Sequence, residues 1–252
     1  AGLQCSGTPT HDIYRDLCRD TMLFFDNRVQ GKDVISDPAL DAKLARLRQG
    51  HPLRLVFGGR LIAMKGVLEL PRVAAELARA GVSFTFDIFG SGPLLGALEE
   101  RIRAAGLQDR MQLRGVLDFD SGWVPWLRDN ADLFICCHPQ GDPSSTYPEV
   151  MSCGVPIAGY DNEAFRGVVR ESGSGWLAPA RDAAALARVV ARLDTDRGAI
   201  AEATRRARDF ARMHAFEPTF ARRSAHIIRN SRLPDALRTE AMARLAATGH
   251  AT

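Results

Sequence analysis

Long hydrophobic runs are missing from this 252-residue chain. It contains no apolar stretch of about eighteen residues, and its first residues show no basic segment followed by an apolar core. The sequence therefore gives no sign of a membrane-spanning helix or a secretory signal, and we expect membrane contact to be peripheral at most. The formal net charge is only +3 and the cations are interleaved with acids, so nucleic acid is not an expected partner.

Cysteine and histidine are also scarce. The five cysteines are odd in number and no pair has the Cys-x-x-Cys spacing, while the six histidines show no metal-ligand spacing. We therefore expect a reducing compartment, hence a cytoplasmic location, and no metal site. The segment Asp118-Phe119-Asp120 looks like an Asp-x-Asp metal motif, but it precedes a predicted helix for which Asp120 or Ser121 is a natural N-cap.

The composition, with 46% hydrophobic and 25% charged residues, suits an α/β enzyme domain with a substantial core. Short apolar runs alternate with helical patterns, which predicts a Rossmann-like doubly wound parallel sheet whose ligands bind beyond the carboxyl ends of the strands. The expected strands lie near residues 53–58, 84–89, 110–114, 132–137, 155–158 and 175–178. Expected helices lie near residues 67–80, 94–105, 121–130, 146–153 and 163–171, with further amphipathic helices at 182–193, 198–213 and 217–230.

A phosphate-binding pattern follows the first of these strands. The apolar run from Leu53 ends in Gly58 and Gly59, Arg60 comes next, and Lys65 precedes a helix. Glycines let a backbone approach a ligand closely, while Arg60 supplies a planar cation and Lys65 a point charge for phosphate oxygens. The pattern is neither a P-loop nor a Gly-x-Gly-x-x-Gly fingerprint. Its alternative interpretation is a solvated loop with two surface cations.

Residues 141–158 are the most informative stretch. A polar loop leads into a helix start that carries Glu149, and a glycine and a buried strand follow. A helix N-terminus favours anions, and a carboxylate in its first turn can reach sugar hydroxyls beside the anion. These are the parts of a nucleotide-sugar pocket. Thr146 and Glu149 also have the spacing of a capping box, so the alternative is a structural role for Glu149.

Together the two patterns resemble the C-terminal half of family 4 glycosyltransferases of the GT-B architecture, over about residues 50 to 230. In that family a Gly-Arg-Leu segment followed by Lys-Gly opens the donor domain, and Gly59-Arg60-Leu61 and Lys65-Gly66 match it. The run from Glu149 to Pro156 matches the second half of the family's later signature. Gly141 stands where that signature has its first glutamate, the residue that normally contacts the transferred sugar.

The resemblance implies a hexosyltransferase that moves a hexose from a nucleoside-diphosphate sugar to a glycan or lipid-linked acceptor, as in polysaccharide biosynthesis, with retention of configuration. Arg60 and Lys65 would stabilise the departing diphosphate, and Glu149 would hold the ribose. The donor is a substrate, and no cofactor and no bridging metal are implied. Further donor contacts are expected from Gly58, Gly59, Gly90, Arg114, His138, Asp142, Ser144, Ser145 and Thr146.

The resemblance also implies a domain organisation. Residues 1–48 would be strand and turn fragments left from an N-terminal acceptor domain and its linker, 49–230 the nucleotide-sugar-binding domain, and 231–252 a helical tail. The acceptor would bind mainly to the missing half, so the isolated chain should bind donor better than it turns over. The alternatives are a nucleotide-sugar epimerase of the same architecture and a non-catalytic nucleotide-binding or scaffold domain. A phosphorylase is disfavoured because Lys65, the only lysine after Lys43, belongs to the phosphate loop.

Overall fold

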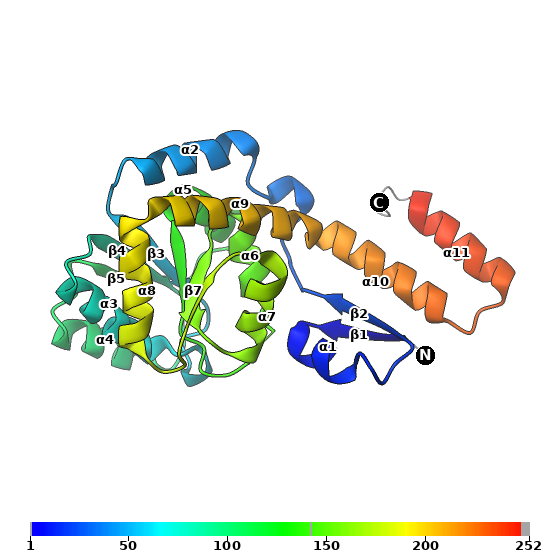
Figure 1. Cartoon of the computed structure of the whole chain (residues 1–252), viewed down its shortest axis with the longest axis horizontal. Helices are drawn as coiled ribbons and strands as arrows, with labels where there is room; N and C mark the ends of the chain where they lie inside the picture. Colours follow the sequence, from blue (N-terminus) through cyan, green and yellow to red (C-terminus); the bar gives the residue numbers. More distant parts are fainter. Residues whose placement is uncertain (1, 142, 248–252) are drawn as a thin grey trace.

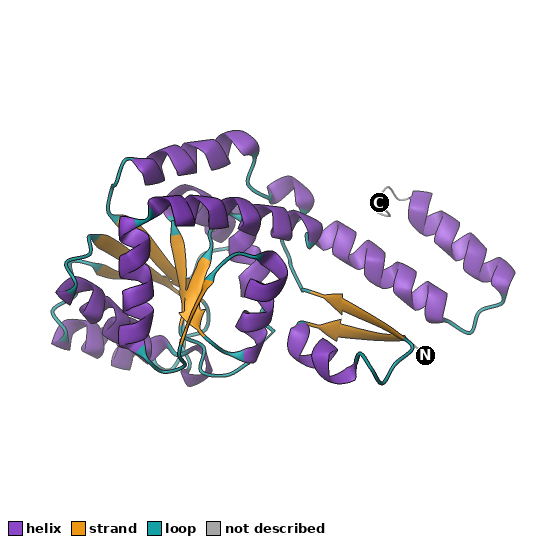
Figure 2. Cartoon of the chain, in the orientation of Figure 1, coloured by secondary structure: helices purple, strands orange, loops and turns teal. Residues whose placement is uncertain are grey.

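The computed structural model describes residues 2–141 and 143–247, and a six-stranded parallel sheet with helices on both faces forms its larger part (Figures 1 and 2). The strand order is β5-β4-β3-β6-β7-β8. All six predicted strands are present, and the expected doubly wound α/β fold is confirmed. The strands are β3 (Leu53–Gly58), β4 (Phe84–Phe89), β5 (Met111–Gly115), β6 (Leu133–Cys136), β7 (Ile157–Tyr160) and β8 (Trp176–Ala178).

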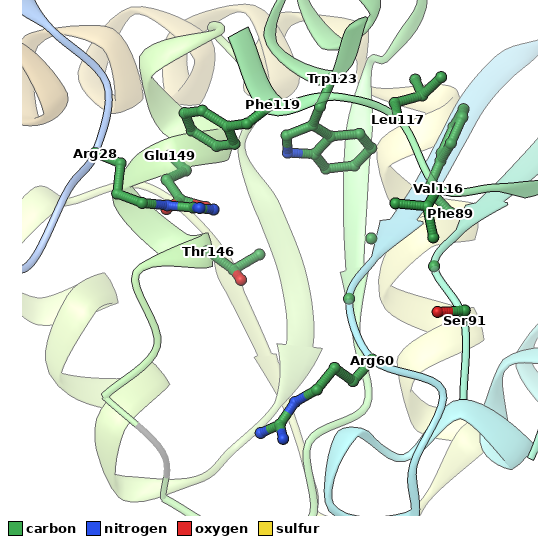
Figure 3. A pocket seen from close by; sticks show the side chains of 13 residues that line it. Arg28, Arg60, Phe89, Ser91, Val116, Leu117, Phe119, Trp123, Thr146 and Glu149 are labelled. Atoms are coloured by element: carbon green, nitrogen blue, oxygen red, sulfur yellow. The ribbon is translucent and has the colours of Figure 1, made fainter. Parts of the chain in front are cut away.

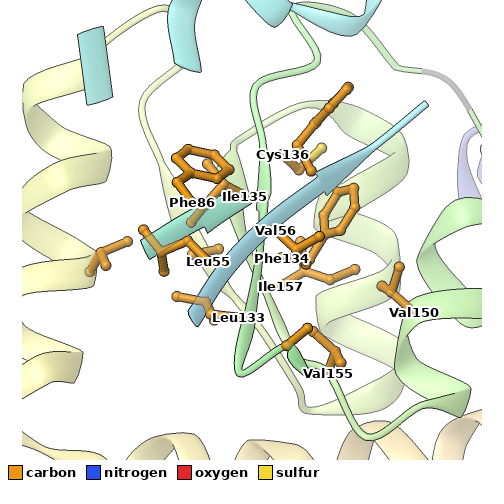
Figure 4. Close-up of a cluster of buried hydrophobic side chains, with 14 of the residues drawn as sticks. Leu55, Val56, Phe86, Leu133, Phe134, Ile135, Cys136, Val150, Val155 and Ile157 are labelled. Carbon is orange, nitrogen blue, oxygen red and sulfur yellow. The ribbon is translucent and has the colours of Figure 1, made fainter. Parts of the chain in front are cut away.

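The central strands carry the core. Leu55 and Val56 of β3, and Leu133 and Phe134 of β6, are fully buried, and Ile157 of β7 joins them (Figure 4). A parallel sheet covered by helices on both faces hides both rows of side chains from water. For this reason the strands are uninterrupted apolar runs in the sequence, and their positions could be predicted from it.

Strands β3 and β6 are neighbours, and the strand order reverses between them. Leu55 lies opposite Leu133 in the register, and Val56 opposite Phe134. Just before β6, the buried carboxylate of Asp132 accepts a hydrogen bond from the backbone N–H of Arg54 at 2.9 Å. It also pairs with the guanidinium groups of Arg54, at 2.9 Å, and Arg46. The amino ends of the two strands are therefore clamped together by charge.

The helices that cover the sheet fall into two groups. Most lie close to where the sequence places them, but the helix at residues 37–48 was not predicted, and it corrects the expectation of a linker there. In one group, α3 contacts both α4 and α8; in the other, α6 contacts both α5 and α9, and α9 also contacts α2 and α7. Their bounds are α2 (Asp37–Arg48), α3 (Leu70–Arg79), α4 (Leu95–Ala104), α5 (Val124–Asn130), α6 (Thr146–Ser152), α7 (Glu163–Ser172), α8 (Ala183–Thr195) and α9 (Arg197–Met213).

A smaller unit lies beside the main sheet. Strands β1 (Gly2–Ser6) and β2 (Asp20–Phe24) pair in parallel, and α1 (Thr8–Tyr14) crosses over between them. Helix α10 (Phe216–Asn230) packs against this pair, and α11 (Asp235–Ala247) contacts α10 (Figure 1). The side-chain amide of Gln4 donates to the carbonyl oxygen of Arg223 at 2.7 Å.

Helix α1 corrects the expectation of strand and turn fragments alone before residue 30. The helix has seven residues, with a proline in its first turn, and only Thr8 among them is buried. Two turns are too short for an apolar period to stand out in the sequence.

Residues 25–36, here called the linker, connect β2 to α2 and lie against α6. The side-chain amide of Asn27 donates to Ser152 Oγ at 3.1 Å, and the backbone N–H of Ile35 donates to the carbonyl of Ser152 at 2.8 Å. The carbonyl of Val29 accepts from the N–H of Phe216 at 3.0 Å. The linker therefore ties the small unit to α6 and to the start of α10.

Lys43 of α2 is a buried cation that joins three helices. Its Nζ donates to the carbonyl oxygens of Leu127 at 3.2 Å, Ala131 at 2.9 Å and Cys153 at 3.0 Å. These carbonyls lie at the carboxyl ends of α5 and α6, where helix carbonyls lack partners within the helix. Burial lowers the pKa of Lys43 from 10.5 to about 8. The ammonium group thus satisfies three carbonyls but is costly to keep charged.

Replacing Lys43 by methionine should change how stability depends on pH. The folded pKa is depressed, so between pH 8 and 10.5 the unfolded chain binds more protons and this lysine makes folding more favourable as pH rises. This pKa shift corresponds to a gain of about 3 kcal/mol in the free energy of unfolding as pH rises from 8 to 10.5, and the Lys43→Met variant should not show this gain. Urea unfolding of both proteins from neutral pH to beyond 10.5 measures the difference.

Cys153, whose pKa burial raises from 9.0 to about 12, makes folding less favourable as pH rises, because its thiol ionises in this range only in the unfolded chain. Both proteins carry this thiol, so the test is the difference between their two pH profiles. Parallel pH profiles for wild type and variant would contradict the assignment.

Candidate functional site

A cavity of about 330 Å³ opens at the carboxyl end of the sheet, where the strand order reverses (Figure 3). Doubly wound sheets bind ligands at such a position. The walls come from the loops after β3, β4 and β5, from the turn before α5, and from the first turn of α6. The lining residues are Arg28, Gly58, Gly59, Arg60, Phe89, Gly90, Ser91, Val116, Leu117, Phe119, Trp123, Thr146 and Glu149.

Two glycine loops meet at the floor of the cavity. The N–H of Gly59 donates to the carbonyl of Phe89 at 3.0 Å, and Gly90 has a φ of +135°. A Cβ on Gly90 would lie 1.9 Å from the carbonyl oxygen of Gly59, and one on Gly58 would lie 2.3 Å from the Trp123 ring. Side chains at these positions would push the loops apart, so the cavity depends on glycine here.

An apolar wall of aromatic rings closes one side of the cavity. Phe89 packs edge-on against Trp123, with ring centroids 5.3 Å apart, and Trp126 lies parallel to Trp123. Val116, which is 69% exposed, and Leu117 continue this wall. The arrangement offers a flat apolar surface of the kind on which a planar ring can rest.

The turn that carries this wall is capped by Asp118. Residues Phe119–Trp123 form a π-helical turn, and the Asp118 carboxylate accepts from the backbone N–H of Ser121 at 2.9 Å. Hydrogen bonds from Ser121 lower the pKa of Asp118. The N-cap is therefore Asp118, and the prediction of Asp120 or Ser121 was wrong: the actual cap lies two or three residues earlier in the sequence.

The two cations of the phosphate-binding pattern take different positions. Arg60 is exposed and lines the cavity, and its side chain makes no hydrogen bond or ion pair within residues 2–141 and 143–247. Lys65, at the end of the short 3-10 turn Ala63–Lys65, is buried and does not line the cavity, and its Nζ lies 3.5 Å from Ser144 Oγ. The interpretation of both as surface cations is therefore wrong for Lys65.

Glu149 stands in the first turn of α6 and lines the cavity, although its side chain is only 4% exposed. Its Oε1 accepts from Nε of Arg28 at 2.8 Å. No capping box forms, because the residue before the helix is Ser145 and makes no side-chain cap; instead Ser144 Oγ accepts from the N–H of Thr146 at 3.4 Å. The structural interpretation of Glu149 as a cap is wrong.

No sequence pattern pointed to Arg28 as a site residue. It lies in the linker, its guanidinium carbon is 4.0 Å from the centroid of the Phe119 ring, and its side chain points into the cavity beside Glu149 (Figure 3). The hydrogen bond to Glu149 raises the pKa of Arg28. The aromatic wall was missed as well, since apolar residues in turns carry no motif.

Of the predicted site residues, the structure brings Gly58, Gly59, Arg60, Gly90, Thr146 and Glu149 together around the cavity.

Other predicted site residues lie elsewhere. Ser144 and Ser145 precede α6 outside the lining, and Asp142 lies outside the described residues. Arg114 and His138 do not line the cavity, and each has another partner. Arg114 pairs with Asp87, Nε to Oδ1, at 2.6 Å, and the buried His138 places Nδ1 3.1 Å from the hydroxyl of Tyr147.

Within the described ranges, no three His, Cys, Asp or Glu side chains are grouped so as to hold a metal ion. Within the same ranges, no helix combines the length and apolar character that crossing a membrane requires.

The substitution Gly90→Ala should destabilise the protein by about 2 kcal/mol or more, because the new Cβ would meet the Gly59 carbonyl at a φ unfavourable to alanine. Gly96, in α4, is the matched control: a Cβ there has no neighbour within 4 Å. Gly96→Ala should be neutral or stabilising by up to about 1 kcal/mol. Urea unfolding of both variants tests this, and equal effects would contradict the close approach.

Known proteins similar to this chain are glycosyltransferases or enzymes of the same fold. The 2-deoxystreptamine glucosyltransferase of Streptomyces kanamyceticus is 31% identical over 149 residues, which is 59% of this chain and 38% of that protein. The amylovoran biosynthesis glycosyltransferase AmsK of Erwinia amylovora is 29% identical over 149 residues, covering 57% of this chain and 36% of its own length. The chain thus spans less than two fifths of these relatives.

Solved structures share the fold at low sequence identity. Sucrose-phosphate synthase from Thermosynechococcus elongatus superimposes with a TM-score of 0.70 at 19% identity, over 90% of this chain and 57% of that one. Anabaena Alr3699/HepE in complex with UDP gives 0.68 at 14% identity, over 99% of this chain and 63% of that one. The family model described as glycosyl transferases group 1 matches residues 52–196, more than half of the chain, and the chain therefore belongs to this family.

Proposed function

We propose that this chain is the donor-binding, C-terminal portion of a retaining glycosyltransferase that transfers a hexose from a nucleoside-diphosphate sugar. The observation that carries the proposal is the meeting of Arg60, Glu149 and a flat apolar wall around one cavity. A nucleoside diphosphate offers each of them a partner: phosphate oxygens, ribose hydroxyls and a planar base. The UDP bound in the Anabaena neighbour supports a nucleotide ligand of this kind.

In the proposed complex, the base would rest against the apolar wall at Trp123, and the ribose would reach Glu149. Arg60 would then approach the diphosphate from the β3 side of the cavity. Its planar fork suits phosphate oxygens, and in a cleft that excludes water it would stabilise the charge on the leaving group. No general base is assigned to this chain, and the leaving phosphate itself is a candidate to take the acceptor proton.

Lys65 does not line the cavity and would act indirectly. Its Nζ lies 3.5 Å from Ser144 Oγ, and Ser144 in turn accepts from the N–H of Thr146. The lysine therefore supports the turn that begins α6 and adds positive charge near the helix N-terminus, where an anion is favoured. Backbone groups of Ser145 and Thr146, and of the loops at Gly59 and Gly90, would complete the diphosphate contacts. Ligand contacts from Arg114, His138 and Asp142 remain predictions.

The acceptor is proposed to be a glycan or a lipid-linked acceptor, which the role of the Erwinia amylovora relative in amylovoran biosynthesis supports. It would bind mainly to an N-terminal domain, of which residues 1–48 would form the final part. The protein would act in the cytoplasm, with peripheral membrane contact at most, and without a metal between donor and protein.

A second candidate is a non-catalytic nucleotide-binding or scaffold domain, which is favoured by Gly141 at the position of a sugar-binding glutamate. Glu163 of α7 stands beside that position: its Oε2 lies 2.7 Å from where a Cβ of Gly141 would be. A carboxylate is therefore still present near the loop, which favours the enzyme. Hydrolysis or transfer of the sugar from a UDP-, GDP- or ADP-hexose separates the two, because a scaffold would bind without turnover.

Calorimetric titration with UDP, GDP and ADP, each with and without magnesium, tests the donor site. We expect one nucleotide to bind without the metal, and Arg60→Ala to weaken it by roughly ten- to a hundredfold, since hydrogen bonds to charged groups are lost. Arg79→Ala is the control, because Arg79 is an exposed arginine of α3 that pairs with Glu76. Unchanged affinity in Arg60→Ala, or no binding by the wild type, would overturn the proposed site.

A further inference from the structure

The linker delivers one arginine to the cavity from a distant part of the sequence. Arg28 is 121 residues from Glu149, yet its Nε donates to Glu149 Oε1 at 2.8 Å. Within the described residues, no other side chain donates a hydrogen bond to this carboxylate. A nearly buried carboxylate without a partner would be costly, so Arg28 compensates for the burial of Glu149 and directs its side chain in the cavity wall.

The position of Arg28 is fixed on both sides by buried neighbours. Asn27 is 3% exposed and Val29 2% exposed, and the Asn27 carboxamide both donates to Ser152 Oγ and accepts from the N–H of Val29 at 3.0 Å. Ser152 lies three residues after Glu149 on α6, so both side chains lie along one side of the same short helix. The backbone that carries Arg28 is therefore anchored to the helix that carries Glu149.

The pair leaves ligand-binding atoms unused. Arg28 contacts Glu149 through Nε, with its plane over Phe119 at 4.0 Å, so its terminal N–H groups and the Oε2 of Glu149 have no recorded partner among the described residues. The Arg28 side chain is 63% exposed, which leaves it open to the cavity, while Glu149 is held at 4%. A single-point contact of this kind orients a carboxylate without occupying both of its oxygens.

We propose that Arg28 is a positioning residue of the donor site, which holds Glu149 so that its free carboxylate oxygen accepts hydrogen bonds from the ribose hydroxyls of a nucleoside diphosphate. This inference rests on the proposed function. It also gives the site a selectivity: the pocket should distinguish a ribonucleotide from the corresponding 2′-deoxyribonucleotide, because only the former presents both hydroxyls to the oriented carboxylate.

The test is calorimetric titration of wild type and Arg28→Ala with two probes, UDP and 2′-deoxy-UDP. Wild type should prefer UDP by roughly tenfold or more, as expected for a lost hydrogen bond to a charged group. Arg28→Ala should bind UDP roughly tenfold more weakly but bind 2′-deoxy-UDP nearly as before, so that the preference falls toward one. Arg28→Lys keeps the charge without the planar fork and should lie between the two.

Two further variants sharpen the assignment. Glu149→Gln should lose the same preference, and adding Arg28→Ala to it should cost little more, because residues that act through one another are not additive. Arg15→Ala is the matched control: Arg15 belongs to the same N-terminal segment, pairs with Asp16 and does not line the cavity. Unfolding midpoints of all variants check that the fold is intact.

Each contrary outcome has a distinct meaning. If Arg28→Ala lost the same affinity for UDP and for 2′-deoxy-UDP, Arg28 would act on the diphosphate or through its charge alone, and the positioning role would be overturned. If Arg28→Ala bound UDP more tightly, Arg28 would be competing with the nucleotide for Glu149. If the affinity were unchanged, Arg28 would not belong to the donor site. Either result would overturn the positioning role. If wild type binds neither UDP nor its deoxy form while GDP or ADP binds, the same comparison is made with that base. Binding of none of the three would overturn the proposed function together with this inference.

Discussion

The pairing of β3 with β6 is the contact on which both the core and the cavity depend. The strand order reverses there, so the loops at the two carboxyl ends lead away in opposite directions and leave a space between them. At the amino ends, Asp132 holds the strands together through the backbone and side chain of Arg54. The ion pair holds the two strands together at their amino ends, and the diverging loops leave a space at their carboxyl ends. The paired strands thus form a rigid base for a ligand site.

Much of the fold was predictable because its signals are local. Strands β3 and β4 begin and end where the sequence analysis placed them, since their apolar runs are bounded by polar residues and by glycines. Local patterns gave wrong predictions of helix caps where a side chain or N–H had another hydrogen-bond partner. Serine is a common N-cap residue, but the backbone N–H of Ser121 donates to the Asp118 carboxylate. Glu149 has the spacing of a capping box, but its carboxylate accepts a hydrogen bond from Arg28 of the linker.

The site was predictable only in the parts that follow single strands or begin a single helix. Gly59 and Arg60 could be chosen because glycine and a cation directly follow a strand, and the resemblance to a glycosyltransferase signature reinforced that choice. For Glu149 the resemblance was decisive, because its position in the first helical turn fits a cap equally well. Whether a side chain reaches the cavity depends on tertiary partners, which the sequence does not reveal. Arg114 is taken up by Asp87 and Lys65 lies beside Ser144, whereas Arg28 arrives from 121 residues away.

The contact between the two ends of the chain also has a consequence for biosynthesis. Gln4 of β1 meets Arg223 of α10 across 219 residues of sequence. At about 5 to 20 residues per second, α10 leaves the ribosome roughly 10 to 40 seconds after β1. During that interval β1 and β2 lack the helix that covers them, and the linker lacks its hydrogen bond to Phe216. The strand pair of β1 and β2 therefore stays uncovered for the whole time in which the residues between β2 and α10 are translated.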